Sequence, residues 1–106
     1  MNHQYRVITH CLKLLHQSQM ADLKKQRVAF RMIQLKRLLS VHRLPEEVTT
    51  GPCSAEVFDA LLAEMGSISR GEGRQEAEDD LLMRLDGVLV SAVQMLKEHA
   101  EPPRFD

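Results

Sequence analysis

The chain has 106 residues, of which 43% are hydrophobic and 27% charged, so it fits one globular domain with one hydrophobic core. Two cysteines are too few for a disulfide framework, and no run reaches the roughly 20 apolar residues that span a bilayer. Aromatic residues are scarce and few β-branched residues alternate with polar ones, which argues against strands. We therefore expect a single all-α domain over residues 1–106: a small antiparallel bundle of about four helices. The absence of a signal segment predicts a cytoplasmic protein that does not contact membranes.

The two halves of the chain carry opposite charge, which the formal net charge of −1 hides. Residues 1–44 hold nine Lys and Arg against one acid, a formal charge of +8. Residues 45–106 hold five Lys and Arg against fourteen acids, a formal charge of −9. Such asymmetry indicates either an anionic partner for the basic half or attraction between the halves, within one chain or across a dimer. The sequence leaves both interpretations open.

The basic half contains no Gly or Pro before Pro45, which is typical of continuous helical structure. Apolar residues share one side of the segment 3–17, whereas His3, Arg6, His10 and Lys13 share the other. The pattern changes phase near residue 18. We therefore predict helices over about 3–17 and 19–43, with Ser18 as a cap; one continuous helix is the alternative.

The acidic half predicts two further helices. Ser54 is a suitable N-cap for a helix over about 54–65, and Gly66 is placed to end that helix. The last helix is expected over about 74–99, with acids at its start as the helix dipole prefers. We expect residues 44–53 and 66–73 to form connections and residues 100–106 to be disordered.

The second predicted helix has apolar residues on two opposite sides. One stripe comprises Ala21, Val28, Met32, Leu35 and Leu39. The other side carries the residues that we predict to form a partner interface: Met20, Leu23, Phe30, Ile33 and Val41, with Leu38 near them. A helix that is apolar on two sides is usually buried on two sides. The second side could contact another helix of the monomer; we expect it to contact another protein chain, most simply a second copy.

The sequence thus predicts a non-enzymatic helical module for protein–protein interaction, such as an adaptor, an assembly chaperone or a regulator, that forms a homodimer through its second helix. The alternative is a nucleic-acid-binding protein, since basic helices can bind phosphates without reading sequence. Its candidate residues are Lys24, Lys25, Arg27, Arg31, Lys36 and Arg37. Neither hypothesis requires a cofactor.

No motif of catalysis or metal binding is present in the sequence. The His and Cys residues are scattered without the spacing of a zinc site, and no Gly-rich phosphate loop follows a strand. His10 and Lys13 form an H-x-x-K pair that resembles histidine phosphotransfer domains, where a His on a bundle helix accepts phosphate. That family usually has a small residue after the Lys, where this chain has Leu14. Phosphotransfer at His10 is therefore a remote alternative.

Overall fold

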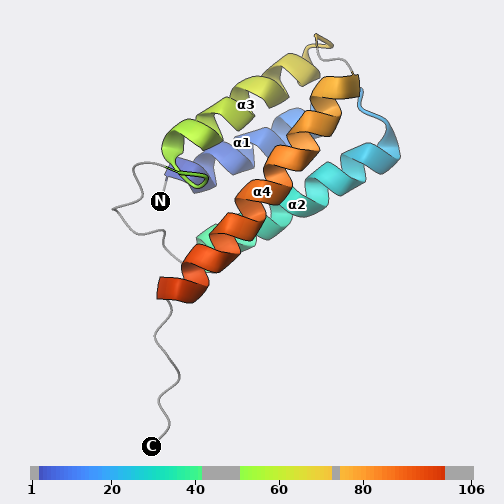
Figure 1. The fold of residues 1–106 in the computed structure, drawn as a ribbon. Helices are drawn as coiled ribbons and strands as arrows, with labels where there is room; N and C mark the ends of the chain where they lie inside the picture. The colour runs from blue at the N-terminus through green and yellow to red at the C-terminus, as the bar shows by residue number, and fades with distance from the viewer. Residues whose placement is uncertain (1–2, 42–50, 73–74, 100–106) are drawn as a thin grey trace, which may run out of the picture.

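The computed structural model describes residues 3–41, 51–72 and 75–99 and contains four helices (Figure 1). These are α1 (His3–Gln17), α2 (Asp22–Val41), α3 (Ala55–Ser69) and α4 (Gln75–His99). The described residues contain no strand, so the predicted all-α bundle is confirmed. None of the four helices is both long enough and apolar enough to cross a membrane. The expected disorder of residues 100–106, and most of the expected connection over 44–53, lie outside the described residues.

The four helices form two hairpins that lie side by side. Within each hairpin, α1 with α2 and α3 with α4, the helices run in opposite directions (Figure 1). Between the hairpins, α1 packs along α3 and α2 packs along α4, each pair running in the same direction. The diagonal pairs, α1 with α4 and α2 with α3, make no close backbone contacts within the described helices. Each helix therefore has an outward face that no other helix of the protomer covers.

The joint between α1 and α2 separates them into two helices, as predicted. Ser18 ends α1: its Oγ donates to the Leu15 carbonyl at 2.7 Å and accepts from the Met20 amide at 3.4 Å. The predicted role of Ser18 as the cap of the second helix is wrong, because α2 begins only at Asp22. Met20 is buried in this joint and joins the core instead of the helix that follows.

The core lies between the hairpins and consists of aliphatic residues, Met, Cys and one Phe. Each helix contributes the stripe that its 3.6-residue period predicts. The most deeply buried large side chains include Ile8 and Leu15 of α1, Met32 and Leu35 of α2, Phe58 and Leu61 of α3, and Leu81 and Leu85 of α4. The stripe of α2 that faces the core is Val28, Met32, Leu35 and Leu39; Ala21, predicted to share it, is exposed.

The third helix is longer than predicted and runs through Gly66 to Ser69. Its start is as expected: Ser54 accepts a hydrogen bond from the Val57 amide at 3.3 Å. Gly66 is buried and lines, with Leu14, a shallow groove between α1 and α3, and a Cβ at this position would meet the Arg70 side chain at 3.3 Å. Gly71 takes over the predicted role of Gly66, since its φ of +77° is the left-handed conformation that commonly follows a helix end.

Candidate protein-interaction site

The outward face of α2 exposes large apolar side chains. Leu23, Phe30 and Val41 are 63%, 62% and 75% exposed, and Ile33 is 43% exposed. They lie on the side of α2 opposite its buried stripe. Of the two apolar sides predicted from the sequence, one therefore faces the core and the other faces solvent. The monomer therefore leaves uncovered four of the five residues predicted to form a partner interface. Met20, the fifth, is only 5% exposed and is corrected to a core residue.

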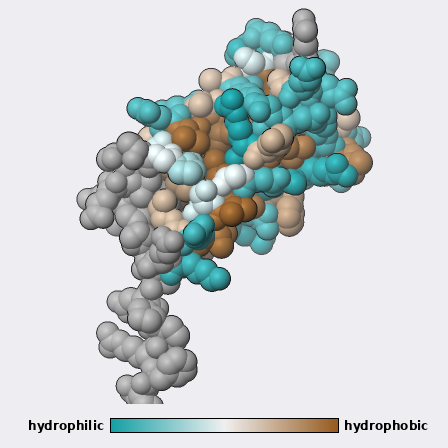
Figure 2. Space-filling model, in the orientation of Figure 1, coloured by the Kyte–Doolittle hydropathy of each residue, from teal (hydrophilic) through white to brown (hydrophobic). Residues whose placement is uncertain are grey.

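The fourth helix adds a second set of exposed apolar side chains beside the first. Met83, Val90 and Val93 are 73%, 65% and 44% exposed. Together with the four on α2, they account for all the large exposed hydrophobic residues of the described chain, so α1 and α3 contribute none. Figure 2 looks onto α4 and shows apolar surface in patches on both sides of this helix. The α4 set was not predicted from the sequence, although its spacing of seven and three residues repeats that of Leu23, Phe30 and Ile33.

The spacing in both helices places these residues along one outward stripe. Residues seven positions apart in a helix are separated by two turns and lie on the same side. A residue three positions further along also lies near that side. Because α2 and α4 are parallel neighbours, we group their outward stripes as one surface, which we name the α2–α4 face and define by Leu23, Phe30, Ile33, Val41, Met83, Val90 and Val93. Large apolar side chains gathered on an exposed surface favour a protein interaction site.

Ion pairs between α2 and α4 engage part of the predicted basic strip. The Lys24 Nζ lies 2.9 Å from Asp79 and 3.6 Å from Glu78, and the hydrogen bond that Lys24 donates to Asp79 raises the pKa of Lys24. Arg31 pairs with Asp86 and also donates to the Arg27 carbonyl. Two of the six predicted phosphate-binding residues thus already hold carboxylates of the same chain. Attraction between the halves of one chain therefore accounts for part of the charge asymmetry.

The other four residues of the predicted strip do not form one surface patch. Lys25 donates to the Ser18 carbonyl at 2.9 Å, at the C-terminal end of α1, where a cation is favourable. The Lys36 Nζ lies 5.6 Å from the centre of the Tyr5 ring, within the range of a cation–π contact. Arg27 and Arg37 are exposed. The structure therefore divides the predicted strip among four different environments.

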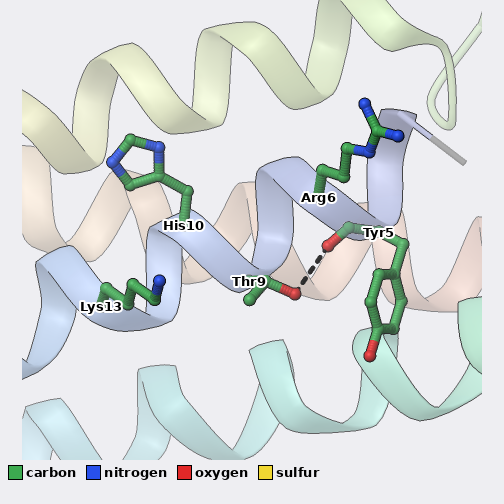
Figure 3. A pocket seen from close by; sticks show the side chains of 5 residues that line it. All are labelled: Tyr5, Arg6, Thr9, His10 and Lys13. Atoms are coloured by element: carbon green, nitrogen blue, oxygen red, sulfur yellow. Dashed lines mark hydrogen bonds between the residues drawn. The ribbon is translucent and has the colours of Figure 1, made fainter. Parts of the chain in front are cut away.

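The outward face of α1 holds a further polar group, the cations Arg6 and Lys13 with the imidazole of His10, of which the sequence singled out only His10 and Lys13, as the H-x-x-K pair. Arg6, His10 and Lys13 are exposed and line one shallow pocket with Tyr5 and Thr9 (Figure 3). The Thr9 hydroxyl donates back to the Tyr5 carbonyl at 2.8 Å. Within the described residues, no carboxylate lies within 4.0 Å of Arg6 or Lys13. The Arg6 and Lys13 cations are open to solvent and to anions.

The buried titratable groups are Cys11, Cys53 and, in part, Glu64. Burial raises the pKa of the Cys11 thiol to about 12 and raises that of Cys53 as well. Both thiols are therefore protonated and poor nucleophiles at neutral pH. Burial also raises the pKa of Glu64, and Asp80 adds to this while Arg84 opposes it. No group of three or more potential metal ligands occurs among residues 3–41, 51–72 and 75–99.

Comparison with known proteins gives no further assignment. No protein-family model, no curated protein and no solved structure matches the chain.

Proposed function

We propose that this protein is a non-enzymatic helical module for protein–protein interaction, an adaptor, assembly chaperone or regulator, that forms a homodimer through the α2–α4 face. The observation that carries the proposal is the gathering of every large exposed apolar side chain of the described residues on two neighbouring helices. Scattered exposed hydrophobic residues are ordinary, whereas seven on one face are not.

The size of the α2–α4 face supports a specific contact. The 20 residues of α2 and the 25 of α4 span about 30 and 37 Å at 1.5 Å per residue. Two helices packed about 9 Å apart present a face roughly 18 Å wide, and hence on the order of 600 Å². A stable interface buries about 800 Å² per partner, so this face approaches the required area. A second copy supplies an identical apolar face, which makes the isologous dimer the simplest occupant.

The experiment that tests the proposal measures molar mass in solution by light scattering after size-exclusion chromatography. The wild-type chain is expected at the mass of a dimer, and Phe30→Asp/Val90→Asp is expected at the mass of a monomer because buried unpaired charges oppose association. Gln17→Asp/Ala63→Asp adds the same charge at exposed positions of α1 and α3 and should remain dimeric. A wild-type chain that is monomeric at all concentrations, with variants of unchanged solubility, would contradict the proposal.

A further inference from the structure

We propose that the outward face of α1, defined by Arg6, His10 and Lys13 with Lys36 of α2 beside it, binds the phosphate backbone of nucleic acid without reading the base sequence. The proposal concerns a different surface from the α2–α4 face and does not rest on dimerisation. It shares only Lys36 with the basic strip predicted on α2, of which Lys24 and Arg31 already pair with carboxylates of α4.

The first support is the charge of this face. Arg6 and Lys13 have no carboxylate within 4.0 Å among the described residues, and the helix α1 contains no acid. Lys36 lies over the ring of Tyr5 at the edge of the same pocket. The acids of the chain are concentrated in the other hairpin, so the overall charge of −1 does not cancel the local positive field.

The second support is the geometry of α1. Arg6, His10 and Lys13 occupy positions i, i+4 and i+7, so their side chains leave one side of the helix. Figure 3, which looks onto α1 between α2 and α3, shows all three on this open side, with Tyr5 directed toward α2. Seven residues of helix span about 10 Å. One nucleic-acid strand carries a charge about every 3.4 Å of the duplex axis, so the stripe extends along about three phosphates.

The third support is the absence of exposed large hydrophobic residues on the described part of α1, since all of them lie on α2 and α4. A helix that lies on a membrane buries an apolar face in the lipid, and protein interfaces depend on apolar or aromatic anchors in their centre. The only aromatic side chain beside the described α1 face is Tyr5, which is half-buried and lies under Lys36. Binding to a phosphate backbone needs only cations and hydrogen-bond donors, which this face does supply.

The test measures binding of the full chain to fluorescently labelled, mixed-sequence DNA and RNA by anisotropy. About three phosphate contacts, from Arg6, Lys13 and Lys36, predict a slope of log K against log salt between roughly −2 and −3, which is a loss of about 16- to 64-fold between 50 and 200 mM salt. Arg6→Glu/Lys13→Glu should weaken binding at least about tenfold. Arg27→Glu/Lys97→Glu makes the same change of charge at exposed positions of α2 and α4 and should weaken it less than about threefold.

Circular dichroism checks the fold of each variant, and Arg6→Gln/Lys13→Gln repeats the comparison without added acids if the reversed charges disturb α1. Polyglutamate and phosphatidylserine vesicles serve as other anionic partners and should bind much more weakly than nucleic acid. Three results would each overturn the proposal: no salt-dependent binding of nucleic acid, equal losses in the α1 variant and its control, or binding of polyglutamate or vesicles through Arg6 and Lys13 as tight as that of nucleic acid.

Discussion

Phe30 and Phe58 provide a direct comparison between an exposed and a buried phenylalanine. Phe30 is 62% exposed on α2, whereas Phe58 is 1% exposed in the core. Burying a whole Phe side chain is worth about 1.5–3 kcal/mol, so covering the exposed part of Phe30 is worth about 1–2 kcal/mol per copy. In a symmetric dimer both copies contribute about 2–4 kcal/mol. Phe30→Ala should therefore raise the Kd of the dimer by about 30-fold to almost 1,000-fold.

Phe30→Ala and Phe58→Ala should also differ in their effect on folding, where Phe58→Ala should be much the more destabilising. Phe30→Ala should change the free energy of unfolding of the monomer by less than about 0.5 kcal/mol, because it alters an exposed position of a helix. Phe58→Ala should lower it by about 3–5 kcal/mol through the cavity left in the core. Sedimentation equilibrium measures the Kd, and urea titration of dilute protein measures the free energy of unfolding. An unchanged Kd for Phe30→Ala in a chain that still dimerises would refute the assignment of the interface.

Three further predictions concern stability and reactivity. Ser54→Ala should lower the free energy of unfolding by about 1 kcal/mol in urea titrations, because the Val57 amide loses its N-cap acceptor; an unchanged midpoint would show that this cap is dispensable. Cys11 and Cys53 should react with a disulfide reagent only on unfolding, since both are fully buried with raised pKa values; rapid labelling of the native chain would contradict their burial. The pKa of Glu64 is higher in the folded chain than in the unfolded chain. Near these pKa values the folded state therefore binds more protons than the unfolded state, and the free energy of unfolding falls as pH rises through them. Glu64→Gln should flatten this fall and raise stability at pH 7 by less than about 1 kcal/mol; a pH profile identical to that of the wild-type chain would refute the role of Glu64.

The sequence by itself determined the helices and the stripe that each one buries. Helical periodicity is a local property, so the phase change near residue 18 predicted separate first and second helices, and the Ser54 cap predicted the start of α3. Ser18, Ala21 and Gly66 are exceptions, because Ser18 does not cap α2, Ala21 is exposed and α3 continues through Gly66 to Ser69. A glycine can end a helix or lie within one, and the local sequence does not distinguish these two positions.

The tertiary structure alone decided which surfaces remain exposed. Both sides of α2 are apolar, and the sequence could not tell whether a neighbour covers the side of Phe30; the packing of α2 on α4 leaves this side open and leaves Val90 exposed on the neighbouring helix. The same packing brings Asp79 and Asp86 to Lys24 and Arg31 across 55 positions of sequence. Charge neutralisation depends on distances of a few ångströms between side chains, which only the arrangement of the helices sets.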